Sequence, residues 1–449
     1  MSSVRKRWKA YPAYKNSGEE WLGQVPKEWE VKRLRFLVAT NPSKAEVRLS
    51  SDDFVSFVPM ETVGEYGGMQ CQERCLDEIG SGYTYFADGD ILIAKITPCF
   101  ENVKGAIAEN LTNGIGFGST EFHVVRPLSA INTVYCFWVS ISYIFRKVGE
   151  AHMYGAGGQK RIPDVFIKNF HLPTPPLPEQ HAIAAFLDQQ CAQIDSLIEK
   201  KQRILGLLDE KRRAVITQAV TRGLDPTVPM KDSGVEWLGE VPEGWKVGRV
   251  AFGYDIVLGK MLQPSPNSEQ DVAVPYYRAM NVQWESIDSD LKVMWATPEE
   301  IKTFSVRQGD MLVCEGGEVG RAAIINLPVD EPTIIQNALH RVRAFKDCHI
   351  GYLLRVLEHV ASADWFSVLC NKSTIAHFTG EKFKALKCPL PPLPEQQAIA
   401  DYLDAQCAAM DSQRKNLEKS IELLREYRAS LITHAVTGKI DVRDVAPLQ

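Results

Sequence analysis

The hexapeptide Pro-Pro-Leu-Pro-Glu-Gln stands at residues 175–180 and again at residues 391–396, an offset of 216 residues. A second stretch, KNSGEEWLGQVP at 15–26, returns at the same offset as KDSGVEWLGEVP at 231–242. The sequences between these landmarks, roughly 35–170 and 251–386, look largely unrelated. Because one frame is repeated around two divergent inserts, the sequence predicts one scaffold that presents two different recognition surfaces.

The bulk composition is typical of a soluble protein with several domains. A chain of 449 residues, 45% hydrophobic and 24% charged, is long enough for about three domains. It contains no apolar run near the roughly 20 residues that span a bilayer. The N-terminus is basic over residues 5–9 but has no apolar stretch behind it, which argues against a signal peptide. We expect a cytoplasmic protein with no membrane partner.

Cysteines and net charge narrow the function only a little. The ten cysteines contain a single close pair, Cys71 and Cys75, and no second pair completes a zinc site, so we expect no metal. A formal net charge of −5 does not exclude nucleic acid, because local basic patches decide phosphate contact.

Both copies of the hexapeptide mark the start of a helix. Proline suits the first helical turn, and glutamate there complements the positive end of the helix dipole. The sequence therefore predicts helix starts at Pro178 or Glu179 and at Pro394 or Glu395. A Pro-x-x-Pro ligand for a small adaptor domain is the competing interpretation.

An apolar residue every seven positions follows each start. The helix-interface positions are, in the first copy, Leu187, Ile194, Leu208 and Val215, with Lys201 between them, and in the second copy Leu403, Met410, Leu417, Leu424 and Leu431. A seven-residue apolar period predicts a coiled-coil seam, for which each helix is the best-matched partner of the other. The alternative is that each helix packs only on its own domain. The helices are expected to end near Thr221 and Thr437, where glycine follows.

The two inserts are expected to be mixed α/β. Short apolar runs between turn residues predict strands, and longer apolar stretches predict helices. The predicted strands are 90–94, 121–125, 310–314 and 340–343, and the predicted helices are 134–148 and 351–369. The fold class is therefore mixed α/β (α+β), with two globular domains joined by two long helices that pack as an antiparallel coiled coil with a pseudo-two-fold internal repeat.

The usual catalytic motifs are missing from the sequence. It contains neither a G-x-x-x-x-G-K-[ST] loop nor a G-x-G-x-x-G in a strand-to-helix setting. The Asn/Asp-Pro-Pro-aromatic tetrapeptide of amino-methyltransferases is absent too, and we expect no catalytic residues in this chain.

Polar and basic clusters inside the inserts are the candidate DNA contacts. Arginine, lysine, glutamine and asparagine contact base edges, and hydroxyl groups reach phosphates. Solvated surface loops are the alternative interpretation of each cluster. The candidates are Lys95, Thr97, Asn102, Lys104, Gln159, Lys160 and Arg161 in the first insert, and Lys260, Arg278, Asn281, Gln336, Asn337, Arg341, Lys372, Ser373, Thr374 and His377 in the second.

Four tryptophans belong to the repeated frame rather than to the inserts: Trp21, Trp29, Trp237 and Trp245. A residue that reads sequence should differ between two readers, and these do not. We therefore expect them to anchor the inserts to the helices, with base stacking as the alternative.

The ordered motifs closely resemble the specificity subunit of Type I restriction–modification systems over essentially the whole chain. The most specific motif is the duplicated Pro-Pro-Leu-Pro-Glu-Gln-x-Ala-Ile-Ala. The phrases GSTEFHV at 118–124, and EGG at 315–317 with Gln336 and Asn337, also resemble target recognition domains of that family.

The resemblance implies a non-catalytic subunit that reads double-stranded DNA. It implies two target recognition domains, each reading half of an interrupted site. It also implies two modification subunits that methylate adenine N6 with S-adenosylmethionine, and restriction subunits that use ATP and Mg²⁺. No cofactor is then expected in this chain. A solitary methylation guide and a self-sufficient methyltransferase or nuclease are the alternatives.

Under this resemblance the chain divides into four parts. They are a first target recognition domain at 1–178 (with the repeated segment 15–34), a central helix at 179–222, a second target recognition domain at 223–394 (with the repeated segment 231–250), and a C-terminal helix and tail at 395–449.

Overall fold

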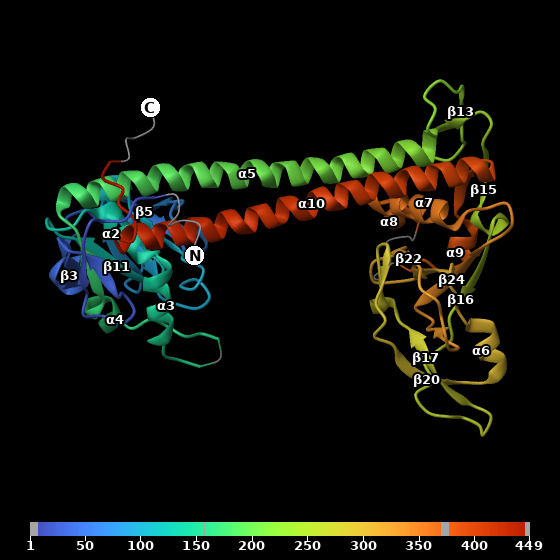
Figure 1. Ribbon diagram of the computed structural model, residues 1–449, viewed down its shortest axis with the longest axis horizontal. Helices are drawn as coiled ribbons and strands as arrows, with labels where there is room; N and C mark the ends of the chain where they lie inside the picture. Colours follow the sequence, from blue (N-terminus) through green and yellow to red (C-terminus); the bar gives the residue numbers. More distant parts are fainter. Residues whose placement is uncertain (1–7, 157, 370–376, 445–449) are drawn as a thin grey trace. The chain divides into compact units, whose positions relative to one another are not determined.

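The computed structural model describes residues 8–156, 158–369 and 377–444. The chain forms two compact units: unit 1 comprises residues 1–201 and 418–449, and unit 2 comprises residues 202–417. Each unit therefore combines one insert with a section of both long helices (Figure 1). The four-part division made from the sequence stays a prediction, because the compact units cut across the helices.

The long helices are α5 (Leu177–Arg222) and α10 (Leu393–Val436). Each begins one residue before the predicted proline, so this proline occupies the first turn, where its missing N–H costs no hydrogen bond. The ends lie within one residue of those predicted. No helix of the described residues combines the length and the apolarity that crossing a membrane requires.

The predicted seam is where the two helices pack, which confirms the coiled-coil interpretation. In unit 1 the first section of α5 packs on the last section of α10, and in unit 2 the remaining sections pack on each other. The predicted seam residues are buried or half-buried: Leu187, Ile194, Leu424 and Leu431 in unit 1, and Leu208, Val215, Leu403, Met410 and Leu417 in unit 2.

Ion pairs across the seam set its register. Asp195 pairs with Arg428 in unit 1, and Arg212 pairs with Asp411 at 3.2 Å in unit 2. The two pairs are related by the 216-residue offset with the helices exchanged, so the repeat extends to interhelical contacts. Within unit 2, Asp209 also pairs with Arg414, and the two sections run antiparallel.

The two divergent inserts contain the same antiparallel sheet. Its strand order is β4-β11-β8-β9 in unit 1 and β16-β24-β21-β22 in unit 2. The strands are β4 (Val38–Thr40), β8 (Ile91–Ala94), β9 (Gly105–Ile107), β11 (Phe122–Pro127), β16 (Tyr254–Leu258), β21 (Met311–Cys314), β22 (Ala322–Ile324) and β24 (Leu339–Ala344). All four predicted strands are confirmed, and the likeness of the inserts emerges only at the level of topology.

A second sheet also recurs, with order β6-β5-β10-β7 in unit 1 and β20-β17-β23 in unit 2. Its strands are β5 (Phe54–Val58), β6 (Gln72–Cys75), β7 (Thr84–Ala87), β10 (Ile115–Gly118), β17 (Val272–Tyr277), β20 (Lys292–Ala296) and β23 (Ile334–Ile335). In both units the middle pair is parallel, β5 with β10 and β17 with β23. The short strands of the frame form two-stranded pairs beside these sheets.

Each helix predicted in an insert is split in two. The first divides into α2 (Thr133–Ser140) and α3 (Tyr143–Ala151), because the Ser142 side chain accepts from the Phe145 amide and caps a new helix. The second divides into α7 (Ile350–Ser362) and α8 (Trp365–Leu369), where Asp364 has a φ of 56° that no helix accommodates. The remaining helices are α4 (Asp164–Asn169), α6 (Pro298–Phe304) and α9 (Gly380–Ala385).

The glutamine of the hexapeptide holds each insert to its long helix. Gln180 accepts from the Asn132 amide at 2.8 Å and donates to the Pro175 carbonyl at 2.9 Å. Gln396 accepts from the His349 amide at 2.9 Å and donates to the Pro391 carbonyl at 2.8 Å. Asn132 and His349 are the N-caps of α2 and α7, so the same amide joins the starts of two helices in both units.

The frame tryptophans pack inside the fold. Trp29 is fully buried, and its indole N–H donates to Glu179 of α5 at 3.1 Å. Trp245 and Trp237 are buried in unit 2, and Trp21 stacks on Phe170 with ring centroids 4.9 Å apart. These contacts favour the anchoring interpretation over base stacking.

A buried histidine fixes the same segment in each unit. On β11, His123 Nε2 lies 2.9 Å from the Ile162 carbonyl, and on β24, His340 Nε2 lies 2.9 Å from the Phe378 carbonyl. A carbonyl only accepts, so each Nε2 carries the proton and donates. Burial lowers the pKa of both histidines.

The two ends of the described chain meet in unit 1. The Asp441 amide donates to the Lys9 carbonyl at 2.7 Å, and Lys439 Nζ donates to the Leu22 carbonyl at 3.2 Å. The segment after α10 therefore closes the frame that the N-terminal segment begins.

The exchanged arginines give a matched test of the helix seam. Arg212 also pairs with Glu285 and Glu358, whereas Arg428 stacks on the Tyr66 ring at 3.6 Å. We expect Arg212→Met to cost about 2–3 kcal/mol, because two part-buried carboxylates lose a cation. Arg428→Met should cost less. Calorimetry of the full chain measures both, and equal losses would contradict the dependence on the acidic partners.

The buried histidines predict a loss of stability in mild acid. Their folded pKa lies below the unfolded value of about 6.5, so the unfolded chain binds protons that the folded chain refuses. Below about pH 6.5 stability should fall, by up to about 1.4 kcal/mol per pH unit for each histidine. His340→Gln keeps an amide donor and removes the titration. Urea unfolding at pH 8 and pH 5.5 should show a smaller acid loss in this variant, and an identical loss would sink the idea.

Candidate DNA-reading loops

Three segments of the unit 1 insert converge at one end of β11. They are the segment after β8 (95–97), the turn between β10 and β11 (119–121), and the loop after α3 (154–161), which Figure 1 shows projecting from the end of that helix. The Lys95 amide donates to the Glu121 carbonyl at 2.9 Å, and the Ile162 amide donates to the Lys95 carbonyl at 2.8 Å. We call this arrangement loop cluster 1.

Unit 2 repeats the arrangement with different residues. The Glu315 amide donates to the Ala338 carbonyl at 3.0 Å, and the Phe378 amide donates to the Glu315 carbonyl at 2.8 Å. These bonds join the segment after β21 (315–317), the turn between β23 and β24 (336–338) and the segment that leads into Phe378. We call this arrangement loop cluster 2.

Thr97 holds the loop after α3 in place. Its hydroxyl donates to the Gly158 carbonyl at 2.6 Å and accepts from the Lys160 amide at 3.0 Å. Gly155 has a φ of 117°, and a Cβ there would lie 2.9 Å from the Gln159 carbonyl oxygen. The loop therefore needs glycine at that position, and the hydroxyl of Thr97 is used to position the loop.

The tip of this loop presents an amide and a cation. Gln159 and Lys160 are exposed, and neither side chain has a hydrogen-bond partner within 8–156, 158–369 and 377–444. Arg161 differs, because its guanidinium forms a two-pronged pair with the Glu121 carboxylate at 2.9–3.2 Å. The pair raises the pKa of Arg161.

Loop cluster 2 brings together three of the predicted residues. The Lys260 amide donates to the Ile335 carbonyl, and the Asn337 amide donates to the Lys260 carbonyl, both at 2.9 Å. A Cβ at Gly259 would lie 2.3 Å from the Gln336 carbonyl oxygen, so glycine permits this close approach. Gln336 and Asn337 are half-buried.

His377 lies at the other side of loop cluster 2. It is exposed, and its Nδ1 would lie 3.5 Å from a Cβ built on Gly316. Lys372, Ser373 and Thr374 lie outside the described residues.

Four of the predicted contacts are already committed inside the fold, which corrects the interpretation of them as free DNA-binding groups. Arg341 is buried and donates to the carbonyls of Thr303 and Ser305 at 2.9 and 2.8 Å. Asn281 is buried and donates to the Asp290 carbonyl at 2.9 Å.

The other two are Arg278 and Lys260. Arg278 donates to the Asp290 carbonyl at 3.0 Å, and the buried Lys260 pairs with Glu300 at 2.6 Å. Their polar atoms hold loops together, since a buried charge is stable only when it is partnered.

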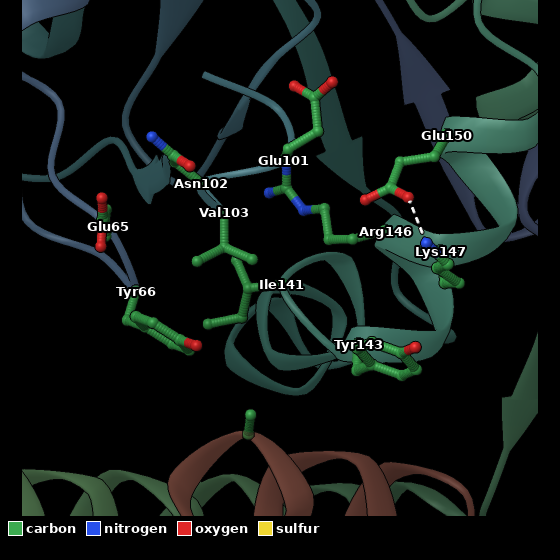
Figure 2. Close-up of a pocket in the computed structure, with 11 residues that line it drawn as sticks. Glu65, Tyr66, Glu101, Asn102, Val103, Ile141, Tyr143, Arg146, Lys147 and Glu150 are labelled. Atoms are coloured by element: carbon green, nitrogen blue, oxygen red, sulfur yellow. Dashed lines mark hydrogen bonds and ion pairs between the residues drawn. The ribbon is translucent and has the colours of Figure 1, made fainter. Parts of the chain in front are cut away.

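Asn102 and Lys104 lie away from loop cluster 1. Asn102 lines a cavity of about 320 Å³ against α10, together with Glu101 and Arg146, as Figure 2 shows. Arg146 donates to the carbonyls of Ser140 and Phe100, and its burial lowers its pKa to about 9. Lys104 Nζ donates weakly to the Met60 carbonyl at 3.4 Å.

Two segments of the clusters were not among the predicted contacts. The turn at 119–121 carries Ser119 and the exposed Thr120, and the glycine turn at 315–317 lies beside His377. A usable signal was present, because both stretches follow or precede a predicted strand directly and carry turn residues. Within the described residues, no group of three or more His, Cys, Asp or Glu side chains is placed to hold a metal.

Comparisons with known proteins agree with this architecture. The model of the Type I restriction modification DNA specificity domain matches residues 26–205 and 242–423, which together exceed half of the chain. Two *Escherichia coli* proteins are similar to it, as is one solved structure. The chain is 35% identical to the EcoAI specificity subunit over 285 residues, or 58% of this chain and 45% of that protein.

The chain is also 38% identical to the EcoEI specificity subunit over 216 residues, which are 47% of this chain and 36% of that protein. It therefore spans less than half of the length of either relative. The crystal structure of the HsdS subunit from Thermoanaerobacter tengcongensis superposes with a TM-score of 0.57 at 18% identity, covering 93% of this chain and 98% of that one.

The duplicated frame, the shared sheets and the paired helices are thus those of a known family. The chain belongs to the family of Type I restriction modification DNA specificity domain proteins.

Proposed function

We propose that this chain is the DNA sequence-recognition subunit of a Type I restriction–modification complex. It binds an interrupted site in double-stranded DNA, one half through loop cluster 1 and the other through loop cluster 2. The observation that carries the proposal is that both clusters have the same backbone hydrogen bonds but different side chains. Constant geometry with variable side chains is what two readers of unlike sequences require.

The exposed side chains of the clusters are suited to base edges. Gln159 and Lys160 offer an amide and an ammonium group, and Gln336 and Asn337 offer two amides. Amide side chains pair with adenine, and lysine pairs with guanine, in the major groove. Thr97 and Arg161 support the loop that carries the first pair.

The chain contributes recognition and assembly rather than catalysis in this proposal. Two modification subunits supply adenine N6 methylation with S-adenosylmethionine, and restriction subunits supply ATP- and Mg²⁺-dependent cleavage. The complex acts in the cytoplasm. The decisive test combines the full chain with the modification subunit of its own system and maps methylation on DNA. Methylation at one interrupted sequence supports the proposal, and methylation by the isolated chain would contradict it.

Replacing the tip of the first loop tests the assignment of half-sites. Gln159→Ala with Lys160→Ala should weaken methylation through the first half-site by about 5- to 150-fold, because each lost base contact is worth about 1–3 kcal/mol. Discrimination at the second half-site should stay unchanged. Methylation rates on DNA libraries randomised in one half at a time measure both effects.

Lys15→Ala is the matched control, because Lys15 is an exposed lysine of the frame in the same unit. It should leave the base preferences of both halves intact. Equal loss at both halves in the loop variant would show that Gln159 and Lys160 make contacts that are independent of sequence.

A further inference from the structure

An exposed phenylalanine occupies the same place in both units. Phe36 is 68% exposed and Phe252 is 71% exposed, and they are related by the 216-residue offset of the frame. Each closes a short 3₁₀ helix, at residues 34–36 and 250–252. A lone exposed apolar residue needs no explanation, but the same one at equivalent places in two copies does.

A second exposed apolar residue lies beside each phenylalanine. The Leu128 amide donates to the Leu37 carbonyl at 2.9 Å, and the Phe345 amide donates to the Gly253 carbonyl at 2.8 Å. Leu128 is 47% exposed and Phe345 is 49% exposed. Both belong to divergent inserts, yet both place an apolar side chain next to the frame.

The apolar pair has a basic neighbour in each unit. Arg33 and Arg249 are exposed and are the N-caps of the two 3₁₀ helices. In unit 1, Arg35 also lies 5.6 Å from the centre of the Phe36 ring. We call Arg33, Phe36 and Leu128, and likewise Arg249, Phe252 and Phe345, the frame patches.

The frame patches lie at the opposite end of the central strand from the loop clusters. Loop cluster 1 precedes β11 and Leu128 follows it, and loop cluster 2 precedes β24 and Phe345 follows it. A strand of six residues is roughly 20 Å long. A duplex held by a loop cluster therefore does not need this end, which argues against a role in DNA contact.

We propose that each frame patch docks one copy of the same protein, the modification subunit. The inference rests on the proposed function. Identical frames bind identical partners, and unlike inserts bind unlike DNA. Phenylalanine and arginine are typical anchors of protein interfaces, and the arginines call for a partner pocket that is apolar inside and rimmed by carboxylates.

Sedimentation of the full chain with its purified modification subunit tests the docking. The unchanged chain should bind two copies. Phe36→Ser and Phe252→Ser should each weaken one copy by at least about 10-fold, and the double variant should weaken both. Phe54→Ser is the matched control, since Phe54 is 52% exposed but has Gln270 at its equivalent position.

Arg33→Glu with Arg249→Glu provides a second test that leaves the apolar residues in place. It should also weaken both copies, because the charge of the rim is reversed. Circular dichroism and the unfolding temperature should be unchanged in every variant.

The outcomes separate the two proposals. If the unchanged chain binds no modification subunit, the proposed function fails. If it binds two copies and all patch variants bind two copies with the same affinity, the frame patches are not the docking sites. Loss of DNA binding with normal partner binding would also overturn the inference, since the patches would then contact DNA.

Discussion

One buried amide at the start of each long helix determines where the rest of its unit lies. Gln180 and Gln396 each accept a hydrogen bond from the start of an insert helix and donate one to the chain that precedes the long helix. Glutamine is suited to this position because its side chain offers an acceptor and two donors. A buried amide without partners would cost about 1–3 kcal/mol, so the contact both stabilises and orients. Sheets, histidines and loop clusters are then built outward from a fixed junction.

The long helices were the part of the fold that sequence predicted best. Their starts and ends were correct to within two residues, because proline and glycine act locally and the apolar period extends over many turns. The four predicted strands were also correct, since each is a short apolar run bounded by turn residues. The broken helices were not foreseen, because capping by Ser142 and the left-handed turn at Asp364 depend on one residue each.

The candidate site was less predictable than the fold. Residue type alone does not distinguish Gln159, which is exposed, from Asn281, which is buried and bonded within its own loop. Arg341 shows the same difficulty, because a strand places its guanidinium under the carbonyls of a neighbouring segment. The common fold of the inserts was invisible for a related reason. Strand order depends on backbone pairing, and many side chains satisfy the same pairing.

Loop clusters 1 and 2 separate two tasks that a recognition surface must perform. Backbone hydrogen bonds and a buried histidine hold the segments, and the exposed side chains remain free to differ. New side chains at the tip of a loop therefore need not disturb the core. Divergence of the inserts is physically inexpensive for this reason, while the frame that carries them stays constant.

The composition of the two units has a consequence for biosynthesis. Unit 2 is one continuous segment, whereas unit 1 needs residues from both halves of the chain. As the chain leaves the ribosome, the second insert can reach its final structure before the first, although it is made later. The first insert must wait for the last section of α10 to cover the seam of α5. Until then the apolar side chains of Leu187 and Ile194 lack their partner, so the earliest part of the chain is the last to become stable.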